Sequence, residues 1–80
     1  MTPIKMATLR FVAERTRDPI TGRVKTADLR EISEPMRQKI IDLGMMDPPL
    51  VQVDADQVSI TGYGDQYLRD AERMNWIPAR

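Results

Sequence analysis

The chain has 80 residues, of which 41% are apolar and 30% charged, and this length suits one small domain with a modest core. It contains no cysteine and no histidine, which argues against a disulfide framework, a thiolate site, a zinc module and a histidine-based hydrolase. The formal net charge is zero. The charge is divided unevenly, because residues 1–40 carry nine Lys/Arg against five Asp/Glu, whereas residues 41–80 carry three against seven. We therefore expect an anion to prefer the amino-terminal half.

The hydropathy pattern also limits the class of protein. No apolar run is long enough for a signal peptide or a membrane span, so we expect a cytoplasmic protein with no membrane partner. No catalytic signature or metal-ligand motif is present, and we expect neither an enzyme nor a cofactor.

A first helix is predicted over residues 3–15, since Thr2 and Pro3 are typical of an N-cap and the first helical position. Its apolar side chains fall on two opposite faces, one with Met6, Leu9, Val12 and Ala13 and the other with Ile4, Ala7 and Phe11. Two such faces predict a central helix buried on both sides, with a dimer surface as the alternative. Apolar residues also alternate here as in a strand, so a strand over residues 9–15 stays open.

A very short strand is predicted over residues 23–25, after a loop that contains proline and glycine. A second helix is predicted over residues 27–32, with Thr26 as its cap. Only Leu29 and Ile32 can anchor this helix, so it depends on packing against other elements.

A third helix is predicted over residues 35–43, because the residue before Pro35 avoids the helical region and a new helix can start there. Met36, Ile40 and Leu43 lie on its inward face. Gly44 is suited to a left-handed conformation that ends the helix.

Residues 50–61 contain two β-branched runs separated by polar turn residues, which predicts a two-stranded hairpin. A helix over residues 62–75 follows, where the apolar period changes to about 3.6. Thr61 is placed to cap this helix. Gly64 allows its first turn to lie close to the hairpin.

The inward positions of these elements form one predicted core: Leu9, Leu29, Ile32, Met36, Ile40, Leu43, Val53, Ile60 and Leu68. At the end of the chain, Met74, Trp76 and Ile77 either close this core or form part of a partner surface.

The order of these elements resembles the winged helix-turn-helix family of DNA-binding domains, of the small bacterial or phage regulator type. The resemblance is carried by TADLREISEPMRQKIIDLGMM, which is similar to a helix-turn-helix, and by ITGYGDQYL, which is similar to the strand and helix that follow the wing. It covers residues 1–80 as a single domain. It implies an α+β, mainly α fold, with a three-helix core, a two-stranded β-hairpin wing and a C-terminal helix.

The resemblance further implies a transcriptional regulator of double-stranded DNA whose helix 35–43 enters the major groove. On that helix Gln38 points away from the inward face and is flanked by Arg37 and Lys39. Gln pairs well with adenine and Arg with guanine, while Lys meets phosphate. The expected DNA-binding residues are Arg23, Lys25, Thr26, Arg37, Gln38 and Lys39. A solvated polar face is the alternative interpretation.

The predicted wing departs from the family pattern. Wings that bind DNA usually carry Arg, Lys or Gly at the tip, but this turn contains Asp54 and Asp56, whose carboxylates would repel phosphate. The alternative function is therefore a winged-helix module that binds a protein instead of DNA, through Gln38, Ile41 and the acidic hairpin. A homodimer through the first helix or the Trp76 region is also compatible with the sequence.

Overall fold

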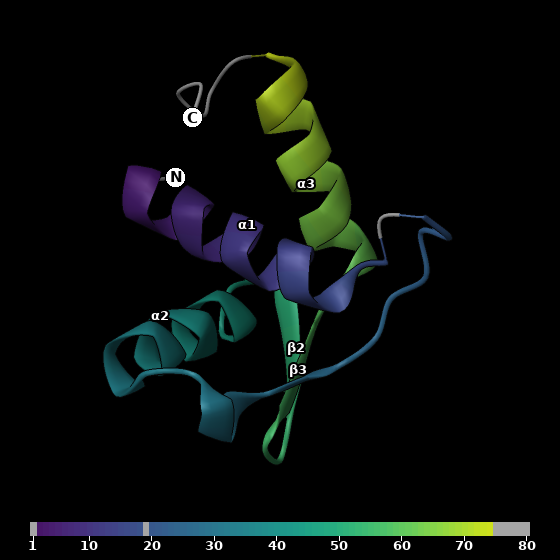
Figure 1. The fold of residues 1–80 in the computed structure, drawn as a ribbon. Coiled ribbons are helices and arrows are strands. Elements are labelled where there is room, and N and C mark those ends of the chain that lie inside the picture. The colour runs from purple at the N-terminus through teal and green to yellow at the C-terminus, as the bar shows by residue number, and fades with distance from the viewer. Residues whose placement is uncertain (1, 19, 75–80) are drawn as a thin grey trace.

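Helix α1 (Pro3–Thr16) lies at the centre of the fold (Figure 1). The computed structural model describes residues 2–18 and 20–74, and in this part of the chain the protein is a small, mostly helical α+β structure. The other elements are β1 (Ala27–Asp28), the 3-10 helix η1 (Leu29–Glu31), α2 (Glu34–Gly44), β2 (Val51–Asp54), β3 (Gln57–Ile60) and α3 (Gly62–Arg73). The strands form one antiparallel sheet in the order β1-β3-β2, and α1 contacts β1, β3, α2 and α3.

Helix α1 begins and ends where the sequence predicts. The Thr2 hydroxyl accepts a hydrogen bond from the Lys5 amide at 3.2 Å, which satisfies one of the free donors of the first turn. At the other end Arg17 leaves the helix with φ −122°. The predicted helix over residues 3–15 is confirmed, and the alternative strand over residues 9–15 is wrong.

Only one of the two apolar faces of α1 is buried. The face that contains Leu9 packs against the other elements, whereas Ile4 on the second face is 61% exposed. Phe11 is half-buried, with the Arg15 guanidinium 3.9 Å above its ring. The predicted burial of α1 on both sides is therefore wrong, because the sheet and the other helices gather on the Leu9 face.

The predicted helix over residues 27–32 is also wrong. Ala27 pairs with Val58 across the sheet, and the Leu29 amide donates to the Asp56 carbonyl at 2.7 Å. These bonds to the hairpin replace the helical bonds of a segment too short to be stable as a helix by itself. The result is the strand β1 followed by the single 3-10 turn η1.

The residue that caps this segment also differs from the predicted one. The Asp28 carboxylate, and not Thr26, accepts from the backbone amide of Arg30, at 2.9 Å. The predicted strand over residues 23–25 is replaced by one isolated bridge, between Val24 and Arg17.

Helix α2 confirms the predicted helix over residues 35–43 and extends it by one residue at each end. Ile40 and Leu43 are fully buried, and the half-buried Met36 packs against the same core. These contacts fix the rotation of α2 about its axis, so its outward side is determined by packing.

The predicted left-handed conformation of Gly44 is wrong. Gly44 is the last helical residue, and Met45 follows with φ −92°. A Cβ on Gly44 would meet the side chains of Val53 and Val51 at 3.5 and 3.6 Å, which is ordinary contact. The end of α2 is therefore packed directly against β2.

The predicted hairpin over residues 50–61 is confirmed, with Val51 paired to Ile60 and Val53 paired to Val58. Val53 was expected in the core, and this expectation is wrong, since its side chain is 38% exposed. It lies beside the last residue of α2, and the helix covers it only in part.

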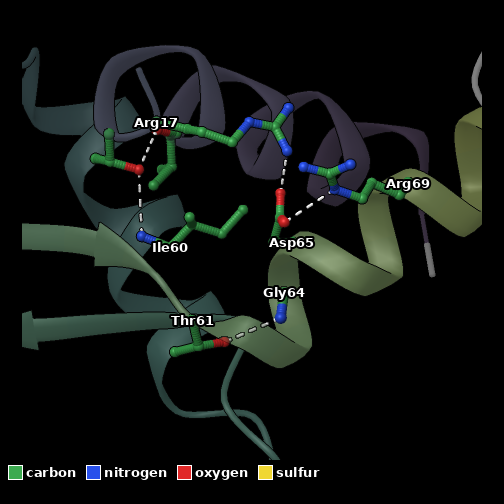
Figure 2. Close-up of polar contacts among 8 residues, drawn as sticks. Arg17, Ile60, Thr61, Gly64, Asp65 and Arg69 are labelled. Atoms are coloured by element: carbon green, nitrogen blue, oxygen red, sulfur yellow. Dashed lines mark hydrogen bonds and ion pairs between the residues drawn. The ribbon is translucent and has the colours of Figure 1, made fainter. Parts of the chain in front are cut away.

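The backbone of Leu50 joins the two halves of the fold. Its amide donates to the Leu43 carbonyl at 3.1 Å, and its own carbonyl accepts from the Thr61 amide at 3.2 Å. The Thr61 hydroxyl accepts from the Gly64 amide at 2.9 Å, which confirms the predicted cap (Figure 2). A Cβ on Gly64 would lie 1.9 Å from the Leu50 carbonyl oxygen, so the predicted close approach of α3 to the hairpin is confirmed.

The predicted helix over residues 62–75 is confirmed as far as Arg73. Met74 is 57% exposed and does not close the core. Residue 75 and the expected contacts of Trp76 and Ile77 lie outside the described residues.

The buried apolar side chains of the described chain form one cluster, to which every element except β1 contributes a member. Its members are Met6, Leu9, Val12, Ala13, Leu29, Ile32, Ile40, Leu43, Leu50, Val51, Val58, Ile60, Leu68 and Ala71. Within residues 2–18 and 20–74, no helix has both the length and the apolar character required to cross a membrane.

Two threonines are buried in this core and differ in their partners. The Thr16 hydroxyl donates to the Val12 carbonyl at 2.8 Å and accepts from the Ile60 amide at 3.2 Å, as Figure 2 shows for the contact with Ile60. The Thr8 hydroxyl donates to the Ile4 carbonyl at 2.9 Å. Thr16 therefore links α1 to the sheet, whereas Thr8 bonds only within its own helix.

Substitution of Gly64 by Ala should destabilise the protein by about 3 kcal/mol or more, because the added methyl group meets a backbone oxygen that cannot move freely. Gly62→Ala is the matched control, since a Cβ there meets nothing within 4 Å, and we expect it to be neutral or to stabilise by up to about 1 kcal/mol. Urea unfolding followed by circular dichroism measures both. Equal midpoints for the two variants would contradict the close packing of α3 on Leu50.

Thr16→Val should cost about 1–3 kcal/mol, because it leaves the buried amide of Ile60 without an acceptor. Thr8→Val removes only a donor to a carbonyl within the helix, and we expect a change of less than about 1 kcal/mol. The free energies of unfolding of the two variants should therefore differ. If they are the same, the bond from α1 to β3 contributes nothing measurable.

Candidate nucleic-acid interface

The outward side of α2 presents Gln38 and Lys39 to solvent. Lys39 makes no ion pair with any described carboxylate. Glu34 and Asp42 are exposed on the same helix. This surface therefore combines one amide and one free cation with two carboxylates, and it is directed outward because Ile40 faces the core.

Arg37 has a different environment from its two neighbours. Its side chain is half-buried, and one terminal nitrogen donates to the Ile32 carbonyl at 3.2 Å. Its Nε is enclosed and has no hydrogen-bond partner among the described atoms. The guanidinium thus connects the end of η1 to the start of α2, so it is not extended beside Gln38 as a free base-reading group would be.

Arg23 and Lys25 are exposed and belong to the segment between α1 and β1, most of which runs on the other side of the hairpin from α2 in Figure 1. Neither side chain is paired with a carboxylate among the described residues. The Lys25 amide donates to the Thr16 carbonyl at 2.6 Å, which holds the loop against the end of α1. The structure therefore does not bring these two cations together with Gln38 and Lys39.

The loop is closed by Asp18, whose carboxylate accepts from the amides of Ile20 and Thr21 at 2.8 and 3.2 Å. These bonds stabilise the ionised carboxylate and lower the pKa of Asp18 below its ordinary value, with the Ile20 amide as the main cause. Gly22 has φ +73°, a conformation that favours glycine. The loop has a defined shape in the single chain.

Thr26 lines a shallow groove of about 300 Å³ between α1 and the β1–η1 segment. The groove is bordered by Arg15, Thr26, Ala27, Asp28, Glu31 and Ile32. The charged groups at its border are the carboxylates of Asp28 and Glu31 and the guanidinium of Arg15. The groove therefore has a net negative charge and does not attract an anion.

The turn of the hairpin is accompanied by a cation that the sequence pattern did not reveal. Arg30 bonds the Asp28 carboxylate at 2.9 Å, and its Nε lies 3.8 Å from the Asp56 carboxylate. The side-chain bond from Arg30 is the main cause that lowers the pKa of Asp28. The same two carboxylates raise the pKa of Arg30. The sequence does not indicate this role for Arg30, because its position beside the hairpin depends on the pairing of β1 with β3.

The arginines of α3 are engaged by carboxylates. Asp65 bonds both Arg17, which follows the end of α1, and Arg69 of α3, the latter at 3.0 Å (Figure 2). Arg73 pairs with Asp70 at 2.8 Å. Among the described residues, the cations without a carboxylate partner all belong to the first 39 positions: Lys5, Arg15, Arg23, Lys25, Arg37 and Lys39.

Residues 2–18 and 20–74 contain no group of three acidic side chains placed to hold a metal ion. No protein-family model matches the chain, and no significant similarity to a curated protein or to a solved structure was found.

The lowered pKa values of Asp18 and Asp28 predict that the fold becomes less stable in acid. A carboxyl whose pKa in the folded state lies below its ordinary value of 3.8 stabilises the fold above that pH, and this contribution is lost as the pH falls through the lower folded value. We expect Asp18→Asn to lose less stability than the parent when urea midpoints at pH 6 are compared with those below pH 3.8. Asn can keep the turn by accepting from the same amides. An unchanged pH dependence in this variant would show that Asp18 does not contribute.

Proposed function

We propose that the chain is a winged helix-turn-helix protein that binds double-stranded DNA as a small transcriptional regulator, with α2 in the major groove. The observation that carries the proposal is the outward side of α2, where Gln38 and an unpaired Lys39 are exposed together. The order of elements supports the same layout, with η1 and α2 as the helix-turn-helix and β2–β3 as the wing. This function implies a cytoplasmic location and requires no catalytic group or cofactor.

Each residue of α2 has a distinct proposed role. The Gln38 amide can pair with an adenine edge through one donor and one acceptor, and Lys39 can neutralise a phosphate. Arg37 acts as a positioning residue, because its bond to the Ile32 carbonyl sets the angle between η1 and α2. Base contact by Arg37 would require this bond to break.

The charge distribution limits the size of the DNA footprint. Glu34 and Asp42 are on the same helix as Lys39 and oppose phosphate binding. In addition, Arg23 and Lys25 belong to the segment between α1 and β1, most of which runs on the other side of the hairpin from α2 in Figure 1, so we do not count them in the α2 surface. We therefore propose few phosphate contacts and a weak dependence of affinity on salt.

The wing is proposed to stay away from the duplex. Asp28, Asp54 and Asp56 lie in or beside its turn and are accompanied by Arg30 alone among the described cations, so this region keeps a net negative charge. Asp54 has no ion-pair partner in the described chain and would repel a nearby phosphate.

Fluorescence anisotropy with labelled random duplexes over a salt series tests the proposal. Lys39→Ala should weaken binding to all duplexes alike and reduce the slope of log K against log salt by about 0.9, the value for one phosphate contact. Gln38→Ala should instead relax the preference at one base position, by about 1–3 kcal/mol. Lys25→Ala is the matched control, because it removes an equally exposed cation on the other side of the hairpin, and we expect no change.

Two results would contradict the proposal. Equal losses from Lys39→Ala and Lys25→Ala would indicate attraction to any basic surface and no role for α2. Absence of binding to any duplex at low salt would favour a protein-binding module, the alternative that the sequence leaves open.

A further inference from the structure

The end of α2 and strand β2 form a surface that combines apolar side chains with unpaired carboxylates. Met45 is 78% exposed and Val53 is 38% exposed, and the contact of Gly44 with Val53 brings the helix end beside the strand. The exposed carboxylates of Asp42 and Asp47 accompany these side chains in the sequence, and neither forms an ion pair with a described cation. We call this surface the acidic patch: Asp42, Met45, Asp47 and Val53.

The acidic patch has no basic residue of its own. No Lys or Arg occurs between residues 40 and 68. The cations that approach this stretch from elsewhere bind other carboxylates, since Arg30 lies beside Asp56 and Arg17 and Arg69 bond Asp65. The carboxyl end of the α2 helix dipole adds further negative potential. The patch is therefore suited to a segment that is both apolar and basic.

The loop at residues 20–25 has this opposite character, and we call it the basic loop. Ile20 is 92% exposed and Val24 is 54% exposed. Arg23 lies between these two residues in the sequence, and Lys25 follows Val24. Neither cation has a carboxylate partner among the described residues. The loop is held in shape by bonds to Asp18, including the Asp18 amide to the Arg23 carbonyl at 2.8 Å. Little conformational entropy would be lost when such a preformed loop binds.

The two surfaces cannot meet within one molecule. The basic loop lies on one side of the hairpin and α2 on the other (Figure 1). Each surface is therefore available to a second copy of the chain.

We propose that the basic loop of one copy docks on the acidic patch of the next. The contact joins two different surfaces, so each pair leaves one loop and one patch free, and the association continues head to tail. The formal net charge of zero means that whole copies do not repel one another. The proposal does not depend on DNA binding, because neither surface includes Gln38 or Lys39.

Sedimentation velocity of the full chain at low salt, over a range of concentrations up to about 1 mM, tests the association in the weak range expected of a small contact. The parent should form dimers and larger species, and their fraction should fall as salt is added. A loop variant, Ile20→Ser with Arg23→Ser, and a patch variant, Met45→Ser with Asp42→Asn, should each associate about tenfold or more weakly. All four positions are exposed, so these variants should keep the fold, which circular dichroism checks.

The mixture of the two variants is the decisive measurement. The loop variant keeps an intact patch and the patch variant keeps an intact loop, so together they should form a 1:1 complex and stop there. A matched control, Ile4→Ser with Lys5→Ser, changes another exposed apolar residue and free cation and should associate like the parent.

Three outcomes would overturn the proposal. The first is a parent that remains monomeric at the highest concentration and lowest salt. The second is association of the loop and patch variants equal to that of the parent. The third is a mixture that shows no complex while the parent associates, since this would indicate an interface made by other surfaces.

Discussion

The fold depends on the position of the Leu50 backbone, where α2, the hairpin and α3 meet. Its amide donates to the Leu43 carbonyl at the end of α2, and its carbonyl accepts from the amide of Thr61, the N-cap of α3, so both polar groups of this fully buried residue are paired. The first turn of α3 lies against the same carbonyl because residue 64 has no side chain. A shift of Leu50 would therefore move the inward faces of two helices at once, and with them the surface that α2 presents.

The second constraint is electrostatic, and it determines which cations are available to a partner. Carboxylates of α3 bond arginines both of α3 itself and of α1, so that much of the positive charge is used to attach α3 to the fold. Exposed pairs of this kind contribute little stability individually. Their more important effect is on function, because the cations left without carboxylates in the described chain are confined to α1, the loop after it and α2.

The two proposed contacts use separate parts of this remaining charge. The outward side of α2 would meet DNA, while the basic loop on the other side of the hairpin would meet a second copy (Figure 1). The sequence suggested one basic footprint from residue 23 to residue 39. In the fold, one part of this footprint lies on the basic loop and the other on α2.

The sequence alone determined the elements whose signals are local. Thr2 with Pro3, and Thr61 with Gly64, specify helix starts through bonds within three residues, and the apolar period of α2 specifies its inward face. Tertiary structure decided the segment at residues 27–32, where pairing with β3 outweighs a weak helical preference. It also decided the exposure of Val53 and the direction of Arg37, and it brought Arg30 beside the hairpin turn. The pairing of residues 27–32 and the position of Arg30 depend on residues more than 20 positions away, and the exposure of Val53 depends on where α2 ends. The direction of Arg37 depends on a carbonyl only five positions away, but the turn between η1 and α2 has to bring that carbonyl within reach.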